Sequence, residues 1–218
     1  VEEAVPPKVD REVIWAIDDW RLMDDGSIDD EFDHRHDLSH GGRIGNFVTV
    51  NGKSLKEFPV KAGERLRLRL LNAANARTFG LNFTGLDPVV IALDGQPVKP
   101  HRPPKGRVTL GAGQRADMIV DMTGKPGDRM TVVDDHVEDT AYDFIVFVHE
   151  GGPPLRQSPL DAPRALAANP IPEPDMGAAI DQKIVIQGGA MGGLAEATFK
   201  GKPWKTRTLF RKHNKVWT

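Results

Sequence analysis

The chain has 218 residues, of which 39% are hydrophobic, with a formal net charge of -2 and no cysteine. This near balance of charge excludes a general attraction for nucleic acid or an anionic membrane surface, and no apolar run approaches the roughly 20 residues that span a bilayer. The absence of cysteine also excludes disulfides, thiol catalysis and a blue-copper centre, which requires one thiolate with two imidazoles.

Many short apolar segments fill the region before Glu150, separated by glycine, proline, asparagine and aspartate, which is typical of strands and turns. In chain order, we expect strands at Val13–Ile17, Phe47–Val50, Arg65–Leu70, Phe79–Phe83, Val89–Leu93, Arg107–Leu110, Met118–Val120, Met130–Val133 and Phe144–Val148. No long amphipathic helix is expected there. The pattern predicts an all-β protein, an antiparallel sandwich or small barrel.

The strand at 65–70 alternates arginine with leucine, and this period of two predicts one buried face and one exposed face. A helix would distribute the arginines around its circumference. We therefore expect the leucines to be buried and the arginines to face solvent: Leu66, Leu68 and Leu70 against Arg65, Arg67 and Arg69. Truncation of Leu68 to alanine is accordingly predicted to be much more destabilising than truncation of Arg67.

Two glycine-containing segments predict turns. Asn51-Gly52 predicts a hairpin between the strand at 47–50 and Lys53–Leu55, because both turn residues tolerate a positive φ. Gly111–Ala116 fits the dinucleotide fingerprint G-x-G-x-x-A, which also requires a following helix to hold the pyrophosphate. An apolar segment typical of another strand follows instead, so we favour a turn between strands over nucleotide binding.

Composition changes after Glu150. The segment 151–176 is too rich in proline for a sheet interior or a regular helix, with Pro153, Pro154, Pro159, Pro163, Pro170, Pro172 and Pro174. We interpret it as an extended interdomain linker with a short helical turn at Ala165–Ala168. Further strands are expected at Lys183–Gln187, Arg207–Phe210 and Val216–Thr218, too few to close a sheet. The predicted organisation is a domain at 10–150, a linker at 151–180 and an incomplete unit at 181–218.

Three histidines, His34, His36 and His40, lie close together in the sequence. A His-x-His pair on a strand would direct both rings to one side, as copper sites require. Their aspartate and glycine neighbours are typical of a polar loop, so we favour solvated or carboxylate-paired histidines. A stand-alone metal-binding module through these three residues stays open as an alternative.

Two charged stretches also suggest binding sites. Asp18–Asp33 is rich in aspartate, but aligning Gly26 with the EF-hand glycine places Arg21 and Phe32 at the ends of the calcium loop, so a solvated acidic loop is the better interpretation. The segment from Lys200 to Lys215 carries seven lysines and arginines with aromatic residues between them, which could serve a nucleic-acid strand. We prefer a strand pair whose neighbours are missing, and no Ser-His-Asp arrangement is evident.

Several phrases in this order resemble the second domain of bacterial, laccase-like, three-domain multicopper oxidases: Gly45–Gly52, Gly63–Arg77, Val90–Pro97 and Val108–Asp117. The resemblance covers roughly Val13 to Glu150, and Gly188–Leu194 with the tail resembles the entry into the third domain. It implies a cupredoxin-like Greek-key sandwich. In that family the copper ligands lie in His-x-His pairs of domain one and in His-rich and His-Cys-His motifs of domain three. Neither set is present here.

The resemblance implies a function for the parent enzyme. The parent would oxidise a reducing substrate at one copper and reduce dioxygen to water at a trinuclear cluster, in the periplasm or outside the cell. This chain would be a copper-free scaffold between domains one and three, inactive alone, with no catalytic, cofactor-binding or metal-ligating residue of its own. The alternative is a copper-less interaction or cell-division protein of the same fold.

The tail from about Lys183 is expected not to form an independent domain. A few strands cannot bury both faces of a sheet, and their unpaired backbone groups seek an edge. We expect pairing with this chain or with a neighbouring copy, which would give a homo-oligomer by strand exchange. We expect no nucleic-acid partner and no membrane partner.

Overall fold

The computed structural model describes residues 5–158, 160–170, 172, 174–180, 184–185, 198–199 and 202–203. The chain divides into two compact units. The first consists of Val1–Asp30 with Arg43–Asn169, and the second of Glu31–Gly42 with Pro170–Thr218.

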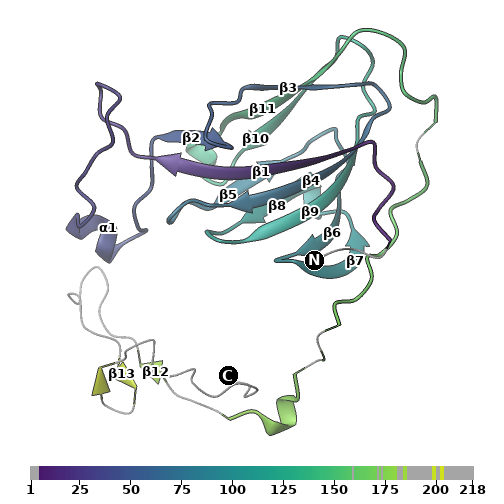
Figure 1. The fold of residues 1–218 in the computed structure, drawn as a ribbon. Coiled ribbons are helices and arrows are strands. Elements are labelled where there is room, and N and C mark those ends of the chain that lie inside the picture. The colour runs from purple at the N-terminus through teal and green to yellow at the C-terminus, as the bar shows by residue number, and fades with distance from the viewer. Residues whose placement is uncertain are drawn as a thin grey trace. The chain divides into compact units, whose positions relative to one another are not determined.

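Two sheets build the first unit (Figure 1). The six-stranded sheet has the order β2 (Phe47–Val50), β1 (Arg11–Trp20), β4 (Arg65–Asn72), β9 (Arg115–Asp121), β6 (Val89–Leu93) and β7 (Gln96–His101). The five-stranded sheet has the order β3 (Glu57–Val60), β11 (Tyr142–His149), β10 (Arg129–Asp134), β5 (Phe79–Asn82) and β8 (Arg107–Leu110). The 3-10 helices η1 (Pro104–Gly106) and η2 (Glu138–Thr140) lie in connections between strands.

The all-β sandwich predicted from the sequence is confirmed, although two strand pairs are parallel. β1 pairs with β4 in parallel, and β11 pairs with β3 in parallel, whereas the other pairings in both sheets are antiparallel. The sequence pattern missed β3 and β7, which contain Pro59 in the first case and Pro97 and Pro100 in the second. Both are edge strands, where a residue without an N–H is tolerated because one side makes no ladder bonds.

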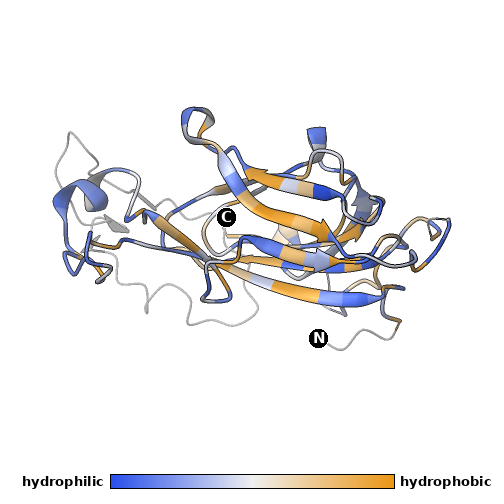
Figure 2. Ribbon diagram, turned by 90° about the horizontal axis from the view of Figure 1, so that it is seen from above, coloured by the Kyte–Doolittle hydropathy of each residue, from blue (hydrophilic) through white to orange (hydrophobic). Residues whose placement is uncertain are grey.

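Aromatic and aliphatic side chains fill the space between the two sheets. Trp15 is 1% exposed and stacks on Phe147 with ring centroids 5.7 Å apart, and Phe58 packs edge-on against Trp15 at 5.4 Å. Apolar residues are concentrated in the strands and hydrophilic residues in many of the connections (Figure 2). The prediction that the three leucines of β4 are buried is confirmed: Leu66 0%, Leu68 0% and Leu70 1%.

The expected exposure of the β4 arginines is wrong for two of the three. Arg65 is 4% exposed and Arg67 is 3% exposed, whereas the side chain of Arg69 is 43% exposed. Arg65 makes two hydrogen bonds to the Asp121 carboxylate, at 2.6 and 2.7 Å, and its Nη1 donates to the carbonyl oxygen of Asp161 at 2.7 Å. The outer face of the sheet is therefore covered at this point by the proline-rich segment.

That proline-rich segment lies against the β-sandwich of the first unit. Residues 153–158 and 160–169 have no regular secondary structure, and the helical turn expected at Ala165–Ala168 is not formed. The amide of Leu155 donates to the Ala62 carbonyl at 2.8 Å, and Asn169 Nδ2 donates to the Gly95 carbonyl at 3.1 Å. Because proline lacks an N–H and fixes φ, an extended path held by a few such contacts suits this composition.

Both predicted turns are present. Asn51 and Gly52 have φ values of 52° and 72°, and the Val50 amide donates to the Lys53 carbonyl at 2.8 Å. The expected return strand at Lys53–Leu55 is reduced to one bridge, because β2 pairs with β1 instead. Gly111–Ala116 joins β8 to β9, as expected for a turn between strands.

The second unit contains short elements. They are α1 (Arg35–Ser39), η3 (Met176–Ala178), β12 (Ile184–Val185), β13 (Thr198–Phe199) and β14 (Lys202–Pro203). The three strands pair with one another in antiparallel fashion. The strand expected at Lys183–Gln187 overlaps β12, whereas those expected at Arg207–Phe210 and Val216–Thr218 lie outside the described residues, as does nearly all of the basic segment from Lys200 to Lys215.

Candidate functional site

The three clustered histidines lie on and beside a short helix, not in the loop that we expected. The rings of His36 and His40 stack with centroids 4.1 Å apart, and those of His34 and His36 are 6.3 Å apart. All three residues are exposed, and His40 Nδ1 lies 3.2 Å from the His36 carbonyl oxygen. Within the described part of the chain, no three His, Cys, Asp or Glu side chains are arranged to hold a metal ion. Because the sequence contains no cysteine, a blue-copper centre, which needs a thiolate with two imidazoles, cannot form within this chain.

The acidic stretch predicted as a solvated loop begins inside a strand. Asp18 and Asp19 belong to β1, and Asp19 is only 7% exposed. Burial raises the pKa of Asp18, with a smaller contribution in the same direction from the neighbouring Asp19 charge. Further along, Asp24, Asp25 and Asp30 are exposed, as expected.

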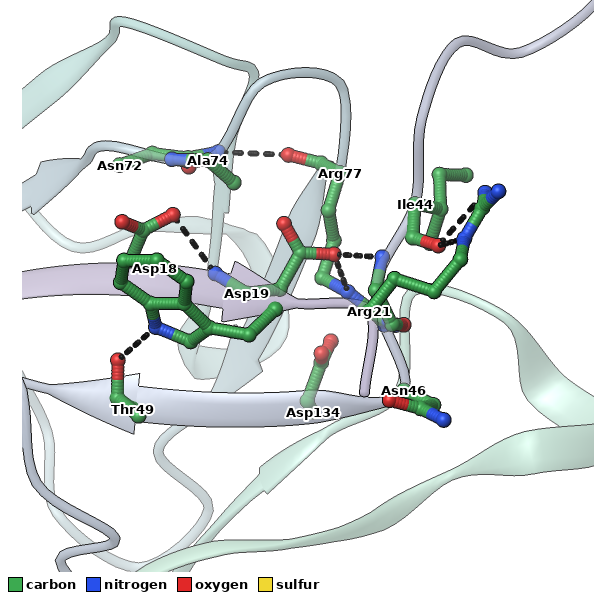
Figure 3. Close-up of polar contacts among 12 residues, drawn as sticks. Asp18, Asp19, Arg21, Ile44, Asn46, Thr49, Asn72, Ala74, Arg77 and Asp134 are labelled. Carbon is green, nitrogen blue, oxygen red and sulfur yellow. Dashed lines mark hydrogen bonds and ion pairs between the residues drawn. The ribbon is translucent and has the colours of Figure 1, made fainter. Parts of the chain in front are cut away.

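Asp19 and Arg77 form a buried ion pair at the end of β1 (Figure 3). Arg77 Nε donates to Asp19 Oδ2 at 3.0 Å, and the Gly45 amide donates to the same oxygen at 2.5 Å. Arg77 Nη2 also donates to the Gly45 carbonyl at 2.6 Å. The other carboxylate oxygen, Asp19 Oδ1, is buried without a hydrogen-bond partner. A buried carboxylate that is only half satisfied depends strongly on its one cation.

A second polar pair, Tyr142 with Asp134, lies near this ion pair. Tyr142 OH donates to Asp134 Oδ2 at 2.9 Å, and Asp134 Oδ1 accepts from the Gly80 amide at 2.9 Å. Burial raises the pKa of Tyr142 well above its ordinary range, the Asp134 and Asp19 charges raise it further, and Arg77 opposes them. Tyr142 therefore lies within reach of the charges of the Asp19–Arg77 pair. The phenol stays neutral and acts as a hydrogen-bond donor.

Sequence reasoning missed this network, although one signal was available. Trp15, Ile17 and Asp19 occupy alternate positions of β1, and the first two are buried. Continuing the alternation places Asp19 in the interior, where a carboxylate requires a partner. The identity of that partner, Arg77, is not indicated by the local sequence.

A cavity of about 390 Å³ lies at the other end of β4, lined by Ala62-Gly63, 121–126 and parts of 154–158. Three charged residues line it: Asp121 and Arg156 are paired, with Arg65 and Asp10 respectively, and Lys125 is exposed. These pairs hold the start of the proline-rich segment in place. The described side chains here indicate a structural role.

Acid should weaken the unit through its paired carboxylates. A hydrogen bond from Arg156 is the main cause that lowers the pKa of Asp10, and one from Arg107 does the same for Asp135. Because these pKa values are lower in the folded protein, the stabilisation is present above the ordinary aspartate pKa of about 3.9 and is lost as pH falls through the folded values.

We therefore expect the free energy of unfolding to fall as pH is lowered below about 4, with a smaller fall in Asp10→Asn. Urea titrations over a pH series measure this, and Asp24→Asn, which changes an exposed aspartate, serves as the control. If Asp10→Asn does not reduce the fall in the free energy of unfolding with pH, the Asp10–Arg156 pair does not contribute to the acid sensitivity.

Within the part of the chain that the structure describes, none of the helices has the length and apolar character of a membrane span.

The two sheets form a cupredoxin-like β-sandwich, as in the solved multicopper oxidases to which the chain is similar. Residues 11–150 match the family model described as multicopper oxidase, which is more than half of the chain. The chain therefore belongs to the multicopper oxidase family, as the sequence resemblance indicated.

Solved structures and curated relatives agree with this assignment. A multicopper oxidase from Pseudomonas thermotolerans has a TM-score of 0.71 and 28% identity, over 83% of this chain and 42% of that one. Lac15 from a marine microbial metagenome has a TM-score of 0.61 and 34% identity, over 83% and 43%. The cell division protein FtsP of Yersinia pestis is 29% identical over 56% of this chain, and a multicopper oxidase of Staphylococcus haemolyticus (strain JCSC1435) is 27% identical over 52%. The matches span 26% and 25% of those two relatives.

Proposed function

We propose that this chain is the copper-free middle domain of a longer multicopper oxidase, together with the beginning of the following domain. The observation that carries the proposal is the family match over residues 11–150 in a chain that contains no cysteine. The parent enzyme would oxidise a reducing substrate and reduce dioxygen to water in the periplasm or outside the cell. The described residues would contribute shape and rigidity to it, and its other domains would supply the copper ligands.

The packing of the first unit supports a scaffold role. Several charged groups inside it form ion pairs, as Asp19 does with Arg77 and Arg65 with Asp121. Three residues of the proline-rich segment, Leu155, Asp161 and Asn169, form hydrogen bonds with the sandwich. These contacts determine the path of the segment. Such a unit can fix where a following domain begins.

A second candidate function is a copper-less interaction protein of the same fold. It is favoured by the similarity to the cell division protein FtsP of Yersinia pestis, at 29% identity over 125 residues. Both candidates share this middle domain. The difference between them lies in the copper ligands of the neighbouring domains.

The reading frame that encodes this chain tests the choice. On our proposal, it contains His-x-His pairs upstream and a His-Cys-His motif downstream of this chain. The full-length protein then binds copper and consumes dioxygen with a reductant. Its blue-copper centre absorbs at roughly 600 nm because of its Cys-His ligation. The 218-residue chain alone should show neither the band nor the activity. A frame without these motifs would favour the interaction protein, and an intense band from this chain alone would contradict both.

A further inference from the structure

Two large apolar side chains are buried on the outer face of the six-stranded sheet. Ile119 of β9 is the cross-strand neighbour of Arg67 of β4, so both point away from the leucines that fill the core, and Ile119 is 2% exposed. Ile91 of β6 is 0% exposed. Neither isoleucine belongs to the apolar cluster between the two sheets. Another part of the chain must therefore cover both of them from outside the sheet.

The proline-rich segment contacts the sheet on either side of these two isoleucines. Arg65 Nη1 donates to the Asp161 carbonyl oxygen at 2.7 Å, where β4 begins and β9 ends. Further along, Asn169 Nδ2 donates to the Gly95 carbonyl oxygen at 3.1 Å, in the turn between β6 and β7. A line between the two contacts crosses β9 and then β6. The segment between them is therefore the cover of the two buried isoleucines.

Burial along this segment repeats every third residue. Between residues 160 and 169, the intervening pairs of residues are exposed and four residues are partly buried: Leu160, Pro163, Leu166 and Asn169. Three residues per turn is the period of the polyproline II helix, a backbone form without internal hydrogen bonds. Proline fixes φ close to the value that this helix requires. One edge of the segment, which carries two leucines and a proline, therefore faces the sheet.

The length of the segment supports this assignment. Arg65 pairs with Asp121 at the end of β9, and the turn that contains Gly95 bonds to Arg115 at its start. β9 has seven residues and is therefore about 20 Å long. The nine steps from 160 to 169 cover about 28 Å as a polyproline II helix, enough to cross the face diagonally, but only about 14 Å as an α-helix.

The segment is held without pairing as a strand. Within residues 160–169 as the structure describes them, each hydrogen bond to the sheet involves a side chain, that of Arg65 or of Asn169. Lifting the segment would break none of the backbone bonds that build the sheet. The contacts of Leu155 and Arg156 would still hold its start on the sandwich. Contacts of this kind can open while the rest of the domain stays folded.

We propose that the outer face of β9 and β6 is a binding groove for a polyproline II helix, and that residues 160–169 are its resident ligand, able to leave it as a unit. When open, the groove takes a proline-rich peptide with an apolar residue at every third position, as other polyproline-binding surfaces do. The resident segment competes with such a peptide, so the apparent affinity falls with the fraction of molecules that are closed. Groove and segment both belong to this chain, so the inference holds for either proposed function.

Single cysteines test the opening, because the chain has no cysteine of its own. Ile119→Cys places one thiol under the segment, and Leu68→Cys places one in the core between the sheets. With a thiol reagent in excess, the first should react at least about tenfold faster than the second, because lifting the segment exposes it while the second requires unfolding of the sandwich. Ile14→Cys, at an exposed position, gives the rate of an uncovered thiol. Ile91→Cys is the second reporter if Ile119→Cys does not fold.

Changes in the segment test the period of three. Leu160→Ser with Leu166→Ser should speed the reaction of the Ile119→Cys thiol at least about tenfold and leave that of Leu68→Cys unchanged. Ala162→Ser with Ala165→Ser, at exposed positions of the same segment, is the matched control and should change neither rate.

A synthetic peptide with the sequence of residues 158–170 tests the groove itself. Added to the variant with both leucines of the segment replaced, it should slow the reaction of the Ile119→Cys thiol, whereas the same peptide with serine at both leucine positions should not. Equal rates at Ile119→Cys and Leu68→Cys would overturn the proposal, because the segment would then open only with the sandwich. A rate at Ile119→Cys equal to that at Ile14→Cys, or a peptide that gives no protection, would overturn the groove.

Discussion

Replacing Arg67 with alanine is expected to lower the free energy of unfolding by about 3–5 kcal/mol, the range for removing one partner of a buried ion pair. Arg67 is 3% exposed and donates to Asp117 Oδ2 at 2.7 Å, and Glu12 lies 3.6 Å away on the other side. Without the guanidinium, the Asp117 side chain, which is 14% exposed, keeps only the longer contact with Arg69 at 3.2 Å, and the space that the buried Arg67 side chain filled is lost. Denaturant titration of the 218-residue chain measures the effect.

Arg69 provides the matched control in the same strand. It contacts the same two carboxylates, Glu12 at 2.9 Å and Asp117 at 3.2 Å, but its side chain is 43% exposed. Arg69→Ala should therefore cost less than about 1 kcal/mol, as exposed pairs do. Leu68→Ala, at a fully buried position, should cost about 2–5 kcal/mol. If Arg67→Ala resembles Arg69→Ala, the outer face at Arg67 is open to water, and the expectation drawn from sequence alternation was right.

The alternation in β4 predicted the strand and its inner face correctly, and failed on the outer face for a physical reason. A period of two identifies which residues share a side, but not what lies above that side. The cover over Arg65 comes from Leu160 and Asp161, 95 and 96 residues later in a proline-rich segment. Arginine tolerates such a site because its fork can bond both Asp121 oxygens and two carbonyls at once. The leucines of β4 carry no such ambiguity, because burial stabilises an apolar side chain.

Proline set the limits of the strand prediction. It argues against central strands, and the segments 57–60 and 96–101, which contain proline, are not among the strands expected from the sequence. Both are strands because they lie at sheet edges, and edge position is a property of the topology. The turn at Asn51-Gly52 was predictable because its positive φ values are a local requirement. Local requirements can be predicted from sequence, whereas partners chosen by the fold cannot.

The buried network at the end of β1 illustrates the same division. The alternate positions of Trp15, Ile17 and Asp19 could have indicated a buried carboxylate. Nothing local indicates that Arg77, which follows β4, supplies the cation, or that the Gly45 amide supplies the second hydrogen bond. These partners meet because β1 and β4 run parallel and β1 extends past the end of β4 at Asn72, so the residues that follow β4 reach Asp19.

Arg77→Met is expected to be among the most destabilising substitutions in the chain, at about 3–5 kcal/mol. Methionine preserves much of the apolar stem but removes the donor to Asp19, whose side chain is 1% exposed and whose Oδ1 already lacks a partner. It also removes the bond to the Gly45 carbonyl, which joins the end of β1 to the segment before β2. Thermal or urea unfolding measures the loss.

Two further variants separate the ion pair from general surface effects. Arg102 pairs with Asp87, but these side chains are 68% and 67% exposed, so Arg102→Met should change the free energy of unfolding by less than about 1 kcal/mol. Asp19→Leu with Arg77→Met should be less destabilising than the sum of the two single changes, because the double variant leaves no unpaired buried charge. The expected loss depends on Asp19 being shielded from water. If Arg77→Met lowers the free energy of unfolding no more than Arg102→Met does, water reaches the Asp19 carboxylate. The Asp19–Arg77 pair then does not stabilise the contact between the end of β1 and Gly45.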